Sequence, residues 1–118
     1  MPSTVLIVDD HPSFRSSARA LLTAEGFEVV GEAEDGESAL QAAGRLEPDV
    51  VLLDVHLPDM DGFAVARALN RRNGSAPTVV LTSSRDASDF GSLVLESGAV
   101  AFVPKAELSG AALQAVLR

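Results

Sequence analysis

Residues 50–54 read Val-Val-Leu-Leu-Asp, an apolar run that ends in a carboxylate. Two further runs share this apolar character, Val-Leu-Ile-Val at residues 5–8 and Val-Val-Leu at residues 79–81. A strand that is apolar along its whole length is typical of a sheet covered on both faces, because neither of its rows of side chains reaches water. The three runs therefore predict buried parallel strands.

These runs belong to a regular alternation of strands and helices. Strands are expected at residues 4–8, 27–31, 49–53, 78–81 and 100–103. Between them, apolar residues recur three and four positions apart, and the first such segment begins at Pro12 and is closed by Gly26. This order predicts an α/β fold, a single doubly wound five-stranded parallel sheet flanked by helices.

The limits of the other helices follow from residues that favour helix starts and stops. Asp35 is expected to cap the second helix and Asp61 the third, because a carboxylate accepts hydrogen bonds from the free N–H groups of a first turn. Apolar spacing from Phe90 predicts a fourth helix that ends at Gly98, and residues 113–117 predict a short fifth one.

The composition excludes several classes of protein. The 118 residues, 47% of them hydrophobic, suit one domain with its own core. The absence of cysteine excludes a disulfide framework, a thiolate zinc site and a cysteine nucleophile. A formal charge of -8 argues against nucleic acid binding by this segment and against an anionic membrane surface. Because there is no signal peptide and no apolar stretch approaching about 18 residues, the expected location is the cytoplasm.

Polar residues follow the carboxyl ends of the predicted strands, where sheets of this kind bind ligands. Asp9 and Asp10 follow the first strand, Asp54 the third and Thr82 the fourth, and the fifth leads into Lys105, the only lysine. The second strand ends in Gly-Glu and contributes little that suggests chemistry. A helix cap, a turn or a solvated charge explains each residue singly, but their convergence favours a site.

Three carboxylates at one edge repel each other unless a cation lies among them. An oxygen-only donor set without cysteine favours Mg²⁺ over zinc or copper. A hydroxyl and an ammonium are suitable partners for phosphate oxygens. The site is therefore interpreted as one for phosphoryl chemistry, in which a carboxylate is the nucleophile.

Six motifs have an order and spacing that are specific in combination: Val8-Asp9-Asp10-His11-Pro12, Asp35-Gly36, Pro48-Asp49-Val50-Val51-Leu52-Leu53-Asp54, Leu57-Pro58-Asp59-Met60-Asp61-Gly62, Leu81-Thr82-Ser83 and Phe102-Val103-Pro104-Lys105. With these motifs the chain resembles, over its whole length, the receiver domain of two-component response regulators, and it is most similar to the NarL/FixJ group. The resemblance implies a flavodoxin-like sheet of order 2-1-3-4-5. It also implies that residues 1–118 are one receiver domain, with no output domain present.

For the metal, the resemblance implies Mg²⁺ held by Asp10 directly, by Asp9 largely through water, by Asp54 and by the main-chain carbonyl of His56. Two interpretations of His56 stay open: only its carbonyl matters, or its imidazole tunes the access of water to an acyl phosphate. His11 is interpreted as a polar residue at the helix entrance rather than a metal ligand.

The resemblance further implies that Asp54 is the phosphoacceptor, which takes a phosphoryl group from a sensor histidine kinase or a small phosphodonor. Lys105 would pair with one phosphoryl oxygen and Thr82 would donate its hydroxyl to another, while the orientation of Phe102 would follow Thr82. The face formed by the fourth helix, fifth strand and fifth helix would then change, and it would bind a downstream protein or a second copy of the chain.

Alternatives to this switch, and to its setting, stay open. A pseudo-receiver would bind partners regardless of phosphorylation. An aspartyl-phosphate hydrolase is disfavoured because Asp54-Val55-His56 lacks a second carboxylate two residues on, so the chain is expected to be a stoichiometric phosphoacceptor that loses its own phosphoryl group, and no enzyme. Since it ends at Arg118, it is either a stand-alone receiver or the excised receiver of a regulator with a C-terminal helix-turn-helix domain.

Overall fold

The computed structural model describes residues 3–71, 76–84 and 90–117. Its strands form one parallel sheet in the order β2-β1-β3-β4-β5, so the predicted fold class and strand order are confirmed. The strands are β1 (Thr4–Val8), β2 (Glu28–Ala33), β3 (Val50–Asp54), β4 (Thr78–Ser83) and β5 (Ala101–Pro104).

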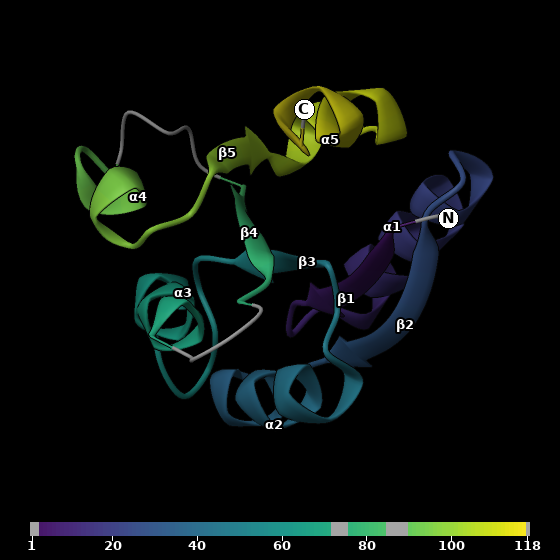
Figure 1. Cartoon of the computed structure of the whole chain (residues 1–118). Coiled ribbons are helices and arrows are strands. Elements are labelled where there is room, and N and C mark those ends of the chain that lie inside the picture. The colour runs from purple at the N-terminus through teal and green to yellow at the C-terminus, as the bar shows by residue number, and fades with distance from the viewer. Residues whose placement is uncertain (1–2, 72–75, 85–89, 118) are drawn as a thin grey trace.

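Helices cover both faces of the sheet (Figure 1). One face carries α1 (Pro12–Ala24) and α5 (Gly110–Leu117), and the other carries α2 (Gly36–Leu46), α3 (Gly62–Asn70) and the short α4 (Leu93–Glu96). A single 3₁₀ turn, η2 (Lys105–Glu107), follows β5. Each face has its own apolar core, and every residue of β3 is buried between them. The continuous apolar runs in the sequence reflect this double coverage.

Two strands continue two residues beyond their expected ends, and β3 and β5 each continue one residue beyond theirs. β2 reaches Ala33 instead of residue 31, because an edge strand can pair its backbone with β1 while the Glu32 side chain extends to the surface. β4 reaches Ser83 instead of residue 81, and its last two residues are buried although they are hydroxylic. In β2 and β4 the run of apolar residues ends before the backbone pairing with the neighbouring strand does.

The fourth helix is shorter than expected. It runs over Leu93–Glu96 and leaves Phe90 outside, although Gly98 does follow its end with a φ of +84°. Gly91 has a φ of +57°, a left-handed conformation that a continuous α-helix excludes. Phe90 instead packs against the rings of Phe63 and Phe102, each with a centroid separation of 5.5 Å. Its apolar character serves the core rather than a helix face.

Both predicted helix caps are confirmed. Asp35 Oδ1 accepts a hydrogen bond from Ser38 N at 2.8 Å, and Asp35 N donates in return to Ser38 Oγ at 3.3 Å. Asp61 Oδ1 accepts a hydrogen bond from Ala64 N at 2.8 Å. Within the described ranges, no helix combines the length and apolar character that are needed to span a bilayer.

Gly62 allows α3 to begin directly against the end of β3. Its N–H donates to the Val55 carbonyl at 2.7 Å. A Cβ on Gly62 would overlap the Asp54 carbonyl oxygen and would lie 2.8 Å from Val55 Cα. Because both neighbours are backbone atoms, a side chain here requires the loop after β3 to move.

Gly62→Ala is therefore expected to destabilise the fold by about 1–3 kcal/mol, the usual range for forced overpacking. Gly44→Ala is the matched control: Gly44 is exposed within α2, so alanine should stabilise the protein by about 0.5–1 kcal/mol. Urea unfolding measures both changes. Equal stability of the two variants would contradict the close approach at Gly62.

Candidate functional site

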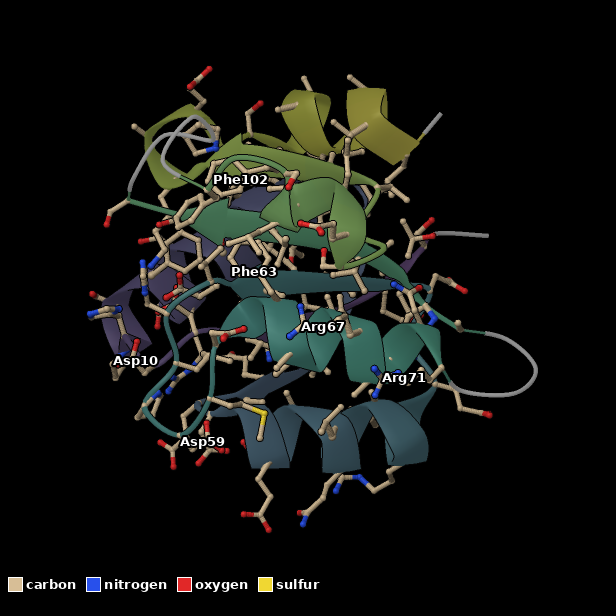
Figure 2. The ribbon with its side chains drawn as sticks, turned by 90° about the vertical axis from the view of Figure 1, so that its left-hand side faces the viewer. Asp10, Asp59, Phe63, Arg67, Arg71 and Phe102 are labelled. Atoms are coloured by element: carbon tan, nitrogen blue, oxygen red, sulfur yellow. The ribbon has the colours of Figure 1, made fainter. Side chains whose placement is uncertain are left out.

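The carboxylates, hydroxyl and lysine singled out from the sequence lie at one edge of the sheet, the carboxyl ends of the strands, whereas Phe102 lies within β5. Asp9 directly follows β1, Asp54 ends β3, and Lys105 directly follows β5. Asp54 and Thr82 are partners in the β3–β4 ladder. In Figure 2 this edge faces left, where Asp10 and Asp59 are labelled, and α3 carries Arg71 towards the opposite side.

A buried ion pair is the centre of this edge. Lys105 Nζ lies 2.6 Å from Asp9 Oδ2 and 3.4 Å from Asp54 Oδ2. Asp9 is 0% exposed and Asp54 3% exposed, so both carboxylates are removed from water. The ammonium also lies 4.5 Å from the centroid of the Phe14 ring, over its face. One lysine thus compensates two buried carboxylates, which leaves the buried group with a net negative charge.

The electrostatics distinguish Asp54 from an ordinary surface carboxyl. Burial raises the pKa of Asp54, and the neighbouring charge of Asp9 raises it further. The Lys105 ammonium and the N–H of His56, which donates to Asp54 Oδ1 at 3.3 Å, oppose this increase in the pKa. The ionised form of such a carboxyl is stabilised when a further positive group approaches it.

Two fully buried polar atoms at this edge lack a hydrogen bond. No described residue donates to Asp9 Oδ2, which contacts Lys105 only as an ion pair, and Thr82 Oγ1 has no described partner. Buried polar atoms are normally hydrogen-bonded, because an unmatched one loses its interactions with water. The Lys105 ammonium compensates Asp9 Oδ2, so Thr82 Oγ1 is the atom to which a ligand could supply a partner.

The loop after β1 brings a histidine to the carboxylates. His11 Nδ1 lies 2.9 Å from Asp9 Oδ1 and 3.1 Å from Asp10 Oδ1. His11 is the N-cap residue of α1, so its expected place at the helix entrance is correct. The contact of its ring with both carboxylates was not anticipated, since residue spacing does not determine how an exposed ring turns.

Four of these residues could hold a metal ion. Asp9, Asp10, His11 and Asp54 each offer a ligand atom, and these atoms lie within 4.8 Å of one another. Carboxylate oxygens suit a hard cation such as Mg²⁺, and a single ammonium leaves these buried carboxylates short of positive charge. The donor set therefore fits the cation that the sequence implies.

Arg15 is a site residue that the sequence reasoning missed. Its Nη1 donates to the Asp9 carbonyl oxygen at 2.6 Å, and its Nε donates to Glu32 Oε1 at 3.0 Å. Arg19 Nε donates to Glu32 Oε2 at 2.7 Å, and the hydrogen bonds from Arg19 and Arg15 lower the pKa of Glu32. Glu32, near the end of β2, thus holds Arg15, and Arg15 holds the loop after β1 that carries Asp9 and Asp10. The spacing of Arg15 and Arg19, one helical turn apart, was the available signal.

An aromatic cluster adjoins the same edge. Phe90 lies at its centre, with ring centroids 5.5 Å from Phe63, 5.5 Å from Phe102 and 6.0 Å from His56. Phe102 lies in β5 and pairs with Leu81 of β4, next to the pair formed by Thr82 and Val103. A change at β4 can therefore reach the start of α4 through packed rings.

Asp59 links the loop after β3 to the start of α2. Asp59 Oδ1 accepts from Gly36 N at 2.7 Å and Oδ2 accepts from Glu37 N at 3.0 Å. These two hydrogen bonds hold the pKa of this exposed carboxyl below its ordinary range. The loop that carries His56 is tied to the neighbouring helix in this way.

The chain is similar to known receiver domains. A sequence model of the response regulator receiver domain matches residues 5–117. The nitrate/nitrite response regulator protein NarP of Escherichia coli K12 is 43% identical over 105 residues, which are 88% of this chain and 48% of NarP. A protein-glutamate methylesterase/protein-glutamine glutaminase of Myxococcus xanthus is 42% identical over 105 residues, 88% of this chain and 30% of that protein.

The fold comparison agrees with these sequence matches. The signal receiver domain of a NarL response regulator from Mycobacterium tuberculosis has a TM-score of 0.85 and 36% identity, and the match covers 98% of this chain and 97% of that one. The chain spans about half the length of NarP and less than a third of the methylesterase.

The opposite pKa shifts of two aspartates predict opposite stability effects. The folded state raises the pKa of Asp54, so ionised Asp54 opposes folding above that pKa, and the penalty vanishes as pH falls through it. Asp54→Asn should therefore stabilise the metal-free protein at neutral pH. The lowered pKa of Asp59 means that its carboxylate stabilises the fold above its ordinary pKa, so Asp59→Asn should destabilise the protein there.

Urea unfolding in a chelator, at neutral pH and at about pH 4, measures both variants against the unchanged chain. The Asp54 difference should shrink at about pH 4, whereas the Asp59 difference should persist there, because it is lost only as pH falls below the ordinary pKa of that carboxyl. If Asp54→Asn is the less stable protein at neutral pH, the buried carboxylate is not the unfavourable group inferred here.

Proposed function

Because the chain belongs to the response regulator receiver domain family, we propose that it is a phosphorylation-controlled switch of a two-component phosphorelay. Asp54 is the phosphoacceptor in this proposal, and a sensor histidine kinase is the donor. The observation that carries the proposal is the convergence of a buried carboxylate, the only lysine and an unpartnered buried hydroxyl at one edge of the sheet.

The proposed reaction is an in-line displacement at phosphorus. A carboxylate oxygen of Asp54 attacks the phosphorus of a phosphohistidine, an O–P bond forms and the N–P bond breaks. The electron pair of the broken bond goes to the imidazole nitrogen of the kinase, which takes a proton. Asp9, Asp10, Asp54 and the main-chain carbonyl of His56 would hold Mg²⁺, which would supply positive charge to the phosphoryl oxygens.

Lys105 and Thr82 are the groups that sense the product. A phosphoryl group on Asp54 adds about one negative charge and three acceptor oxygens. The Lys105 ammonium is already 3.4 Å from Asp54 Oδ2, so a short movement brings it to a phosphoryl oxygen. The buried Thr82 Oγ1, which has no hydrogen-bond partner among the described residues, gains an acceptor. Both contacts draw the ends of β4 and β5 towards Asp54.

The proposed output is a change in the face formed by α4, β5 and α5. Phe102 would transmit the change to this face, because the Phe102 ring packs on Phe90 just before α4. Three large apolar side chains on this face are exposed: Leu93 (43%) and Leu95 (82%) in α4, and Val100 (56%) in the segment between α4 and β5. These apolar side chains suit a partner protein or a second copy of the chain.

The setting of the domain is part of the proposal. Residues 1–118 act as one receiver domain and bind no nucleic acid directly, in keeping with the charge of -8. The output is a separate partner or a DNA-binding helix-turn-helix domain in the same protein, as the response regulator NarP spans about twice the matched length. In the methylesterase relative, the sequence similar to this chain makes up 30% of a longer protein that is named as an enzyme. In our proposal this chain is a stoichiometric phosphoacceptor in the cytoplasm.

Incubation with Mg²⁺ and acetyl phosphate, followed by intact mass measurement, should reveal one labile added phosphoryl group. Asp54→Ala should abolish the adduct, whereas Asp49→Ala should not. Asp49 is the matched control, because its carboxylate lies at the opposite end of β3, where it accepts from Thr4 N at 2.9 Å. Absence of any adduct would favour a phosphorylation-independent receiver. Phosphate release far faster than adduct decay would favour a hydrolase.

Lys105→Arg is expected to separate phosphorylation from switching. Arginine keeps the charge but differs from lysine in reach and donor geometry. The variant should therefore still accept one phosphoryl group on Asp54, while the NMR shift changes of Thr82 and Phe102 on phosphorylation should be at most half those of the unchanged chain. Unchanged shift perturbations in Lys105→Arg would refute this role for the lysine.

A further inference from the structure

We infer that His11 Nδ1 is an additional metal ligand, so that the site at Asp9 and Asp10 also takes a six-coordinate, nitrogen-favouring transition cation, for which Ni²⁺ is the probe. The inference concerns the metal site of the proposed function and rests on it for the carboxylate ligands. The observation that supports His11 as a ligand is that its Nδ1 contacts the carboxylates of both Asp9 and Asp10.

The distances match the edge of an octahedron. Metal–ligand bonds of about 2.1 Å place neighbouring octahedral ligands about 3.0 Å apart. His11 Nδ1 is 2.9 Å from Asp9 Oδ1 and 3.1 Å from Asp10 Oδ1. The contact with Asp9, a hydrogen bond in the metal-free chain, and the contact with Asp10 therefore both have the spacing of adjacent ligands of one cation.

The backbone holds the ring in this place. His11 N donates to Asp9 Oδ1 at 2.8 Å, which folds the chain back over the carboxylate. Arg15 Nη1 donates a hydrogen bond to the Asp9 carbonyl oxygen at 2.6 Å and so holds the backbone of this loop. The His11 side chain is 64% exposed, so a cation can reach Nδ1 from solvent.

An imidazole changes which cations the site prefers. Carboxylates and water suit Mg²⁺, whereas an imidazole nitrogen favours later divalent ions, with affinity rising towards Ni²⁺ and Cu²⁺. His11 should therefore add affinity for Ni²⁺ and contribute little to Mg²⁺. If the ring instead only donates a hydrogen bond to the carboxylates, its removal should affect both ions alike.

The chain provides its own control. It contains two histidines and no cysteine, so a nitrogen ligand from a side-chain imidazole must be His11 or His56. The His56 ring packs against Phe90, with centroids 6.0 Å apart, and its proposed ligand is a main-chain carbonyl that alanine retains. His56→Ala therefore removes an imidazole beside the site without removing a proposed ligand.

The test is calorimetric titration of the tag-free 118-residue chain with Mg²⁺ and, separately, Ni²⁺, without phosphodonor. Ni²⁺ should bind the unchanged chain at least about 10-fold more tightly than Mg²⁺, and His11→Ala should lose at least about 10-fold in Ni²⁺ affinity while its Mg²⁺ affinity changes less than about 3-fold. Asp49→Ala, at the opposite end of β3, should change neither value by more than this margin, and His56→Ala should lose less Ni²⁺ affinity than His11→Ala.

Three results would overturn the inference: unchanged Ni²⁺ affinity in His11→Ala, an equal loss in His56→Ala, or parallel loss of Ni²⁺ and Mg²⁺ in His11→Ala. His11→Phe serves if alanine prevents folding, which circular dichroism checks. Ni²⁺ should also shift the ring proton resonances of His11 well before those of His56. Absence of Mg²⁺ binding by the unchanged chain would instead count against the proposed function, while the Ni²⁺ comparison would still decide the role of His11.

Discussion

The contact of Lys105 Nζ with the buried carboxylates of Asp9 and Asp54 is the interaction on which the site depends. The strands are apolar along the part that lies between the two helical layers, so polar side chains begin at their carboxyl ends. At this edge the carboxylates of Asp9 and Asp54 are buried. A single buried carboxylate without a partner would be strongly unfavourable. One ammonium shared between two carboxylates makes the arrangement stable enough to fold and leaves it short of positive charge.

Backbone geometry then holds the loops around this ion pair. Gly62 lets α3 start against the Asp54 carbonyl, and Asp59 binds the free N–H groups at the start of α2. Arg15 fixes the Asp9 carbonyl and is itself held by Glu32 at the end of β2. The loops after β1 and β3 are thus set by contacts outside the charged cluster, so a ligand meets groups that are already positioned.

The sequence predicted the parts that depend on periodicity and on residue type. Continuous apolar runs predicted the sheet, and Asp35 and Asp61 predicted helix starts, because burial and capping have strong local signals. The role of Arg15 and the turn of the His11 ring depend on contacts between elements that periodicity does not encode. The shortened α4 was missed for a similar reason: the left-handed Gly91 and the packing of Phe90 among other rings overrode an apparent helical spacing.

The charge of the edge explains why a lone lysine can act as a sensor. Three carboxylates and one ammonium leave two negative charges, which one divalent cation would neutralise. In the proposed switch, a phosphoryl group on Asp54 would then restore about one negative charge beside a buried side chain. The response must come from groups already at the edge, and the described residues offer two: the Lys105 ammonium, whose nearer partner is Asp9, and the unmatched Thr82 hydroxyl. Because these groups lie at the ends of β5 and β4, any movement that satisfies the new oxygens displaces those strands first, and with them the ring of Phe102 that packs on Phe90.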